Sequence, residues 1–182
     1  GPGGLIADDD DDGDGFLDVI EVTCESDPLD VTSIPDDMDG DGICDLMDDD
    51  VDGDGIPNED EFGLPLDTSS TNPDTDGDGT CDGPEAPANG GCVAGPDAFP
   101  LDPAGAVDTD GDGKPDQLMP GVTSTSQPPL VEDLDDDDDT WSDAGELACG
   151  TSDPLDAASV PADTDGDGIC DALDPYLDLP FT

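Results

Sequence analysis

The sequence predicts a mostly irregular fold with little regular secondary structure, in which short acidic loops repeat along the chain. Aspartates recur at alternate positions in seven segments of the 182 residues, and in six of these a glycine follows the third aspartate. The formal net charge is -52, with a single Lys or Arg and no His. Aromatic residues make up only 3% of the chain, so an ordinary hydrophobic core is not possible and other links must stabilise the fold.

Three of the seven segments, at 10–21, 50–61 and 74–85, match in full the twelve-residue pattern D-x-[DN]-x-[DN]-G-x5-E. Calcium takes six to eight oxygen ligands at about 2.3 to 2.6 Å, and one curling loop can offer several carboxylates to the same ion. Glycine at position 6 allows the sharp turn that this wrapping needs. The predicted side-chain ligands are Asp10, Asp12, Asp14, Asp18, Glu21, Asp50, Asp52, Asp54, Asn58, Glu61, Asp74, Asp76, Asp78, Asp82 and Glu85.

Four further loops keep most of this pattern. Those at 37–48 and 163–174 end in Asp, a shorter acid that reaches an ion less easily through both oxygens. The loop at 108–119 ends in Met119, and the loop at 135–146 has Thr140 where glycine belongs, so we expect these two to be the weakest sites. Their predicted ligands are Asp37, Asp39, Asp41, Asp45, Asp48, Asp108, Asp110, Asp112, Asp116, Asp135, Asp137, Asp139, Asp143, Glu146, Asp163, Asp165, Asp167, Asp171 and Asp174.

Position 7 of each loop is expected to give its backbone carbonyl to the ion. Its side chain is then free, and we expect it to carry an apolar group inward. The seven residues at this position are Phe16, Ile43, Ile56, Thr80, Lys114, Trp141 and Ile169.

The charge of the chain restricts its partners. Nucleic acid, phosphate ligands and anionic membrane surfaces are recognised through Lys and Arg, and the chain has only Lys114. A salt-adapted surface or a disordered acidic tail is the alternative explanation, and the runs at 8–12 and 135–139, taken alone, are typical of solvated charge. The aspartates nevertheless fall at loop positions, which favours ion binding. A chain with this self-repulsion is not expected to become compact without cations.

These loops are not expected to be complete EF-hands. An EF-hand needs a helix on each side of its loop, yet only Asp49 separates the loop at 37–48 from the loop at 50–61. The segments between other loops contain Pro and small residues, which favour turns and extended chain. We therefore expect no room for flanking helices.

Several loops resemble the thrombospondin type 3 repeats and their prokaryotic surface-protein relatives. The segments DTDGDGICDALD at 163–174 and DMDGDGICDLMD at 37–48 look like that repeat directly. PDAFPLDP at 96–103, followed by DTDGDG at 108–113, is similar to the form common in microbial adhesins and stalks. The resemblance covers roughly residues 8–178 and implies chain wrapped around calcium ions in an extended or curled rod; Met119 and Thr140 depart from it.

A longer repeat lies above the short one, because features of 16–44 recur at 141–170. The chain therefore divides into an N-terminal segment (1–9), a first module with three loops (10–61), middle repeats with two loops (62–121), a Ser/Thr/Pro spacer (122–134), a second copy of the first module with two loops (135–174) and an apolar tail (175–182). We expect the chain, which starts at Gly1, to be a processed product or an excerpt of a longer polypeptide.

The six cysteines allow 15 pairings. The duplication makes Cys24 equivalent to Cys149 and Cys44 to Cys170, so the simplest pairing joins Cys24 to Cys44, Cys149 to Cys170, and Cys81 to Cys92. Zinc is the alternative, but it favours His and C-x-x-C spacing, and the chain has neither. Disulfides together with calcium loops indicate an oxidising, calcium-rich extracellular or cell-surface location.

Three classes of function remain. The first is a structural subunit, rigidified by calcium, of a fibre, stalk or adhesin; the second is a calcium-dependent binding module of a larger secreted protein; the third, an enzyme with paired carboxylates, we do not expect, since loop spacing explains every acid cluster. We expect copies of the chain to assemble head to tail, through the apolar residues Tyr176, Leu177, Leu179 and Phe181 on a neighbour's Leu5, Ile6 and Phe16. Hydroxyls at 68–71 and 123–126 are candidate sites for O-linked glycans. No apolar run approaches the ~20 residues of a membrane span.

Overall fold

The computed structural model describes residues 9–63 and 66–176. The described residues divide into two compact units, the first within 1–75 and 79–96 and the second within 76–78 and 97–182. Each unit is described here by itself. The residues expected to form the head-to-tail contact, apart from Phe16 and Tyr176, lie outside the described ranges, and so do Leu64 and Pro65.

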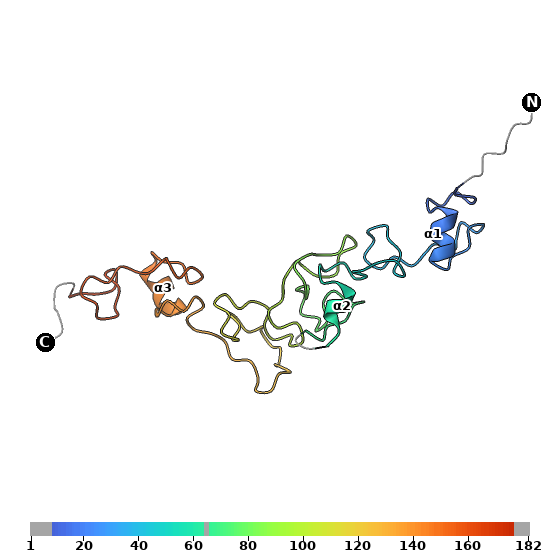
Figure 1. Ribbon diagram of the computed structural model, residues 1–182. Coiled ribbons are helices and arrows are strands. Elements are labelled where there is room, and N and C mark those ends of the chain that lie inside the picture. Colours follow the sequence, from blue (N-terminus) through green and yellow to red (C-terminus); the bar gives the residue numbers. More distant parts are fainter. Residues whose placement is uncertain (1–8, 64–65, 177–182) are drawn as a thin grey trace, which may run out of the picture. The chain divides into compact units, whose positions relative to one another are not determined.

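Regular secondary structure in the described ranges consists of three short helices: α1 (Asp18–Thr23) and α2 (Asn58–Glu61) in the first unit and α3 (Asp143–Cys149) in the second (Figure 1). A single parallel bridge joins Thr80 to Val93. The expectation of a mostly irregular chain is therefore confirmed for this part of the sequence. Among the helices in the described ranges, none has the length and apolar composition that crossing a membrane requires.

The expectation that there is no room for helices was too strict. Each helix begins at position 9 of a loop and contains the glutamate at position 12, so loop and helix share residues. The glutamate at position 12 already makes a helical hydrogen bond: the N–H of Glu21 donates to the Leu17 carbonyl at 3.0 Å, and the N–H of Glu146 donates to the Ser142 carbonyl at 2.9 Å. With four to seven residues, these helices are nevertheless shorter than those of an EF-hand.

All seven loops are closed by the same pair of hydrogen bonds. The N–H of position 9 donates to the carbonyl of the residue before the loop, as from Asp18 to Asp9 at 2.9 Å and from Asp171 to Ala162 at 2.8 Å. In return, the side chain at position 9 accepts from the N–H of position 2, for example Asp18 from Asp11 at 2.8 Å and Asp171 from Thr164 at 2.7 Å. The equivalent side-chain bonds in the other loops are accepted by Asp45, Asn58, Asp82, Asp116 and Asp143.

Two positions in every loop have a positive φ. As expected, position 6 has a positive φ, which ranges from 83° at Gly168 to 106° at Gly15 among the glycines and is 87° at Thr140. Position 4 is the second such position: it is glycine in six loops and Asp138, at φ 54°, in the seventh. Side chains with a Cβ rarely adopt this region, so the loop at 135–146 carries backbone strain at both points.

The buried apolar residues are mainly cysteines. The disulfides Cys24–Cys44, Cys81–Cys92 and Cys149–Cys170 confirm the pairing predicted from the duplication. One cysteine of each bridge (Cys44, Cys81 or Cys170) stands at position 8 of a loop and is at most 2% exposed. In the loops that carry these bridges, position 8 is thus an inward position.

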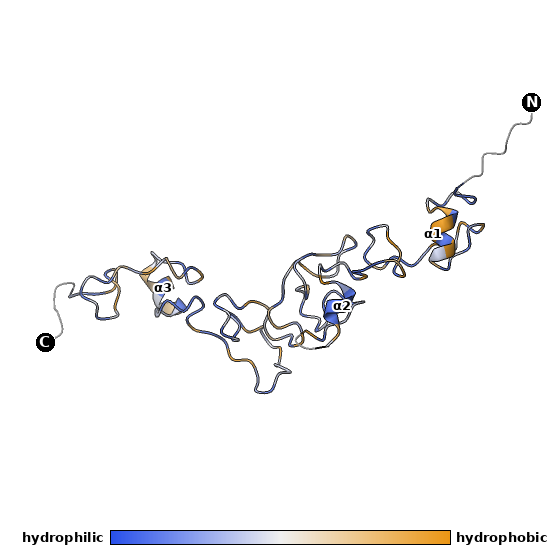
Figure 2. Ribbon diagram, viewed as in Figure 1, coloured by the Kyte–Doolittle hydropathy of each residue, from blue (hydrophilic) through white to orange (hydrophobic). Residues whose placement is uncertain are grey.

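The prediction that position 7 carries an apolar side chain inward is wrong for at least two loops. Ile43 is 46% and Ile169 is 45% exposed, because position 8 takes the inward place. Other large apolar side chains, such as Phe62 at 73%, are also exposed. Hydrophobic residues gather visibly on α1, whereas α2 is hydrophilic (Figure 2).

The segment expected to be a Ser/Thr/Pro spacer is bonded to the rest of the second unit. The buried carboxylate of Asp102 accepts hydrogen bonds from the Ser124 hydroxyl and from the N–H groups of Thr125 at 3.1 Å and Ser126 at 3.0 Å. The Thr125 hydroxyl donates to the carbonyl of Leu101 at 2.9 Å. Two of the hydroxyls considered for O-linked glycans are therefore occupied within the fold.

Candidate calcium sites

The carboxylates at positions 1, 3 and 5 converge within their loops. In several loops, oxygens of the three side chains lie within 4.8 Å of one another. This spacing suits oxygens that share one hard cation. Groups of this kind are Asp10, Asp12 and Asp14; Asp37, Asp39 and Asp41; Asp50, Asp52 and Asp54; and Asp108, Asp110 and Asp112.

Backbone N–H groups orient these carboxylates. In six loops position 1 accepts from the N–H of position 6, as Asp50 does from Gly55 at 3.1 Å. In the loop at 10–21, positions 3 and 5 each use one oxygen to accept from the N–H two residues later: Asp12 accepts from Asp14 at 3.2 Å and Asp14 from Phe16 at 2.8 Å. The other oxygens of Asp12 and Asp14 are buried without a hydrogen-bond partner. In this loop the local backbone therefore fixes one oxygen of each of these two side chains and leaves the other oxygen free for a cation.

The glutamates at position 12 provide the strongest evidence for cation sites. Glu21, Glu61 and Glu146 are 0% exposed, and both carboxylate oxygens of Glu61 and of Glu146 lack a hydrogen-bond partner. A buried carboxylate with no partner costs several kcal/mol, so native proteins pair such groups with donors or metals. The donor set here consists of oxygens alone, which fits calcium rather than zinc.

The loop at 50–61 is the most enclosed. Asp52 and Asp54 are 1% and 0% exposed. Burial, followed by the charge of Asp54, raises the pKa of Asp52 to about 7, and burial, followed by Asp52 and Asp54, raises the pKa of Glu61 to about 8. A bound divalent cation would favour the charged forms and lower both pKa values.

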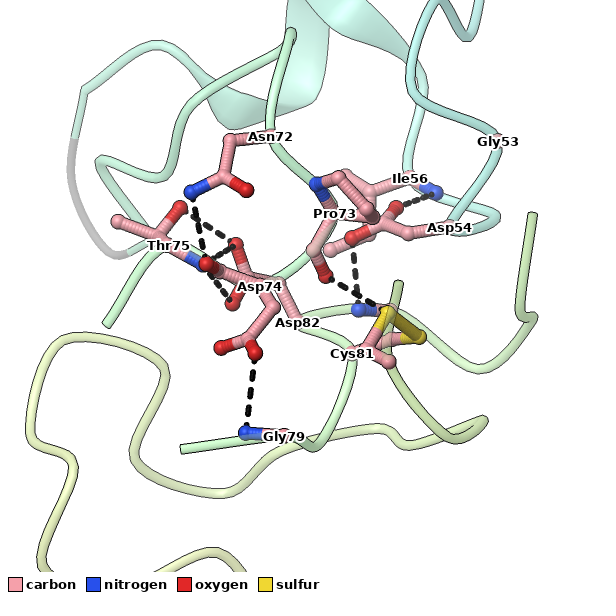
Figure 3. Close-up of a disulfide and its surroundings, with 12 residues drawn as sticks. Gly53, Asp54, Ile56, Asn72, Pro73, Asp74, Thr75, Gly79, Cys81 and Asp82 are labelled. Carbon is pink, nitrogen blue, oxygen red and sulfur yellow. Dashed lines mark hydrogen bonds between the residues drawn. A yellow bond between two sulfur atoms is a disulfide. The ribbon is translucent and has the colours of Figure 1, made fainter. Parts of the chain in front are cut away.

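Neighbouring chain in the first unit encloses this loop. Asp54 accepts at one carboxylate oxygen from the N–H of Ile56 at 2.8 Å (Figure 3). Its other carboxylate oxygen accepts from the N–H of Gly83 at 2.8 Å, and its carbonyl accepts from the N–H of Glu85 at 2.7 Å. A Cβ added to Gly83 would lie 2.3 Å from the Asp54 carbonyl oxygen, so glycine is needed there for close approach. The Asp54 carboxylate is therefore held from both sides.

Further chain covers the other acids of the loop at 50–61. The N–H of Asn72 lies near the Asp52 carboxylate and acts to lower its pKa. The buried hydroxyl of Thr68 lies beside Glu61. Ser26 plays the same part for the loop at 10–21, because its hydroxyl donates to Glu21 at 3.2 Å. In the loop at 135–146, Ser152 lies beside Glu146. Sequence reasoning missed these hydroxyls; the only signal was a Ser or Thr five to seven residues after each buried glutamate.

The boundary between the units passes through the loop at 74–85, so its parts are described separately. In the first unit, Asp74 accepts from the N–H of Gly79 at 2.9 Å, and both oxygens of Asp82 accept from Thr75 (Figure 3). In the second unit, Asp76 accepts from the N–H of Asp78 at 3.0 Å. Glu85, predicted as the ligand at position 12, is exposed, and no helix includes it.

Each of the two loops expected to be weakest departs from the others in its own way. In the loop at 108–119, the Lys114 ammonium contacts Asp112, at position 5, and Asp133 at 3.1 Å; the N–H of Met119 donates to the Ala104 carbonyl at 2.8 Å. The loop at 135–146 keeps a fully buried Glu146 despite its strained backbone. The order of their affinities stays a prediction.

The residues at position 9 have a role that the sequence pattern did not suggest. They were predicted as ligands, but in every loop they accept from the N–H of position 2, and so they close the loop. In three loops position 2 is a threonine whose hydroxyl occupies the second carboxylate oxygen as well, as Thr109 does on Asp116 at 2.7 Å. The side chain at position 9 is therefore held by hydrogen bonds within the chain, without an ion.

Comparison with known proteins identifies the repeats. Residues 10–31 and 163–173 match the model of the bacterial TSP3 repeat. No curated protein and no solved structure matches the chain. The first matched segment contains the loop at 10–21 of the first module, and the second contains most of the loop at 163–174 in the duplicated module.

Proposed function

We propose that this chain is an extracellular structural protein whose folded state depends on calcium ions held in its repeated loops. TSP3 repeats are calcium-binding extracellular repeats, and the matches at 10–31 and 163–173 lie on predicted loops. The three disulfides agree with an extracellular location. The observation that carries the proposal is the full burial of Glu21, Glu61 and Glu146 with carboxylate oxygens that have no partner.

The role of calcium follows from the charge. The acids of each loop lie within a few ångströms of one another, and the chain has one basic residue to compensate 53 acidic ones. In each occupied loop an ion would replace that repulsion by attraction to several oxygens. The residues that would hold it are the acids at positions 1, 3, 5 and 12 with the carbonyl of position 7. Calcium would thus take the place that a hydrophobic core has in other proteins.

We further propose that the chain serves as a calcium-rigidified subunit of a fibre, stalk or adhesin, with copies joined head to tail. Support comes from the exposed Tyr176, 67% accessible, next to the apolar tail of the sequence. An apolar cavity of about 450 Å³ beside Phe16, Leu17, Ile20 and Met47 supports it too. The second candidate is a calcium-dependent adhesion module that does not polymerise, favoured by the many exposed apolar side chains. We propose no catalytic role.

Removal of calcium tests the first part of this proposal. Excess chelator at low ionic strength should expand the protein, because the unscreened carboxylates repel one another. Small-angle scattering would report a larger radius of gyration, which should return to its starting value when calcium is added back. A scattering profile that chelator leaves unchanged would show that folding does not depend on divalent ions.

Truncation tests the second part. Deletion of residues 176–182 should give monomers in calcium, whereas the intact chain should form filaments visible by electron microscopy. Filaments that persist after the deletion would place the contact elsewhere. Monomers of the intact chain that still fold with calcium would favour the adhesion module.

A further inference from the structure

In the loop at 135–146, Asp136 stands at position 2 and Asp143 at position 9. Three other loops have a threonine and an aspartate at these two positions. In the loops at 108–119 and 163–174, the threonine hydroxyl at position 2 donates to the aspartate at position 9, at 2.7 and 2.8 Å. The loop at 135–146 keeps the backbone bond, from the N–H of Asp136 to Asp143 at 2.9 Å. Its side chain at position 2, however, is a carboxylate, so a like-charge pair replaces a hydrogen bond.

The burial of Asp136 distinguishes this pair of acids from the equivalent pair in the loop at 10–21. Asp136 is 9% exposed, and one of its carboxylate oxygens is buried without a hydrogen-bond partner. The loop at 10–21 has the same two acids, Asp11 and Asp18, but there Asp11 is exposed, so water can solvate it. A buried carboxylate that faces another carboxylate needs a positive charge or a shared proton.

More acids surround the pair, and the basic residue is engaged elsewhere. Asp116 and Glu132 line the same cavity as Asp136 and Asp143, with a volume of about 580 Å³. The negative charges of Asp143, Asp116, Asp133 and Glu132 all act on Asp136. Lys114, the single Lys or Arg of the chain, contacts Asp112 and Asp133 instead. Asp133 also accepts from the N–H groups of Leu134 at 2.7 Å and Asp135 at 3.2 Å, so it is already satisfied.

We propose that Asp136 and Asp143, with Asp116 and Glu132, bind a further divalent cation between the loops at 108–119 and 135–146. Asp136 stands at position 2 and lies outside the set at positions 1, 3, 5 and 12 that each loop uses for its own ion. Carboxylate oxygens as the only donors favour calcium. The site would join two consecutive loops, one of which lacks an acid at position 12.

The test compares the number of calcium ions bound by the full chain and by three variants, using native mass spectrometry and equilibrium dialysis at saturating calcium. Asp136→Thr rebuilds the threonine and aspartate pair of three other loops and should fold; we expect it to bind one ion fewer than the wild type. Asp136→Asn should lose the same ion. The matched control is Asp138→Asn, which removes the same charge from an exposed residue of the same loop, at a φ of 54° that asparagine accepts.

Equal stoichiometry of the wild type and Asp136→Thr would overturn the inference and indicate a proton shared by the two carboxylates. Loss of an ion from Asp138→Asn as well would also overturn it, because the effect would then follow the charge of the loop alone. The inference rests on the calcium binding of the proposed function. A wild type that binds no calcium would overturn both, whereas an unchanged stoichiometry in Asp136→Thr would overturn the inference alone.

Discussion

The loops at 50–61 and 108–119 have nearly the same local backbone and very different surroundings. In both, the position-1 aspartate accepts from the N–H of the glycine at position 6, at 3.1 Å for Gly55 and 3.0 Å for Gly113. Yet Asp52, at position 3, is 1% exposed, whereas its counterpart Asp110 is solvent-exposed. The twelve-residue pattern thus determines the conformation of a loop but not its burial.

Chain outside the loop accounts for the difference. Gly83 and Glu85 bond Asp54 of the loop at 50–61, and Asn72 and Thr68 lie near its Asp52 and Glu61. The loop at 108–119 has Met119 in place of a carboxylate and meets a lysine ammonium at Asp112. Affinity for calcium should therefore differ more between these loops than their sequences suggest, since enclosure and ligand charge both affect it.

The largest expected effect is on the enclosed loop. Glu61→Gln removes the charge of a fully buried carboxylate, and we expect the calcium affinity of this loop to fall by about 100-fold or more, because a charged ligand is lost from a preformed site. The control is Glu59→Gln, which removes the same charge from an exposed residue of α2. Calcium titration in competition with a chromophoric chelator measures both variants. Identical titrations for the two would mean that Glu61 is not a ligand.

A gain is expected in the other loop. Met119→Glu supplies the missing acid at position 12 of the loop at 108–119, and we expect about ten-fold tighter calcium binding there, since ligand charge tunes the affinity of such loops. Gln117→Glu adds the same charge at an exposed neighbouring position and serves as the control. The amide NMR signals of Gly111 and Gly113 report on occupancy of this loop alone. An equal shift of the midpoint in both variants would indicate a general charge effect.

A smaller effect concerns Asp102, a buried carboxylate that backbone and hydroxyl donors satisfy without an ion. Burial acts to raise its pKa, but hydrogen bonds from Ser124, Ser126 and Thr125 outweigh this and lower the pKa to about 2. A lowered folded-state pKa stabilises the protein above the ordinary value of 3.8, and this contribution is lost as the pH falls from about 4 to 2. Asp102→Asn should remove it at neutral pH as well.

Amide hydrogen exchange of Thr125 and Ser126 measures this local effect. At neutral pH we expect exchange about 30-fold faster in Asp102→Asn, which corresponds to ~2 kcal/mol for hydrogen bonds to a charged group. Well below pH 2 the wild type and the variant should converge, because both then carry a neutral side chain. A difference that persists below that pH would show that the shape of the side chain, not its charge, holds the segment at 122–134.

Local features of the fold could be predicted from the sequence, because they repeat. The alternating aspartates gave the convergence of positions 1, 3 and 5, and the duplication of 16–44 at 141–170 gave the disulfide pairing. Both depend on residues close together in the chain. The short helices were missed, since they overlap the loops instead of flanking them.

Features that depend on distant residues could not be predicted. Nothing in the pattern at 50–61 indicates that Gly83 will bond Asp54, 29 residues away, or that Thr68 will lie beside Glu61. The role of position 9 was misjudged for another reason: an aspartate suits both an ion and a backbone N–H, and spacing alone does not separate the two. Position 4, glycine in six loops, was a visible signal whose meaning lies in its positive φ.

The disulfides also determine how the chain would respond to tension along its length. The cysteines of the three bridges are 20, 11 and 21 residues apart in sequence. An extended chain gains about 3.5 Å per residue, so each longer bridge withholds roughly 70 Å of contour length, because the load passes through the S–S bond. The loops at 50–61 and 108–119 lie outside all three bridges. A pulling force would therefore unroll loops such as these, while the chain between paired cysteines stays at fixed length.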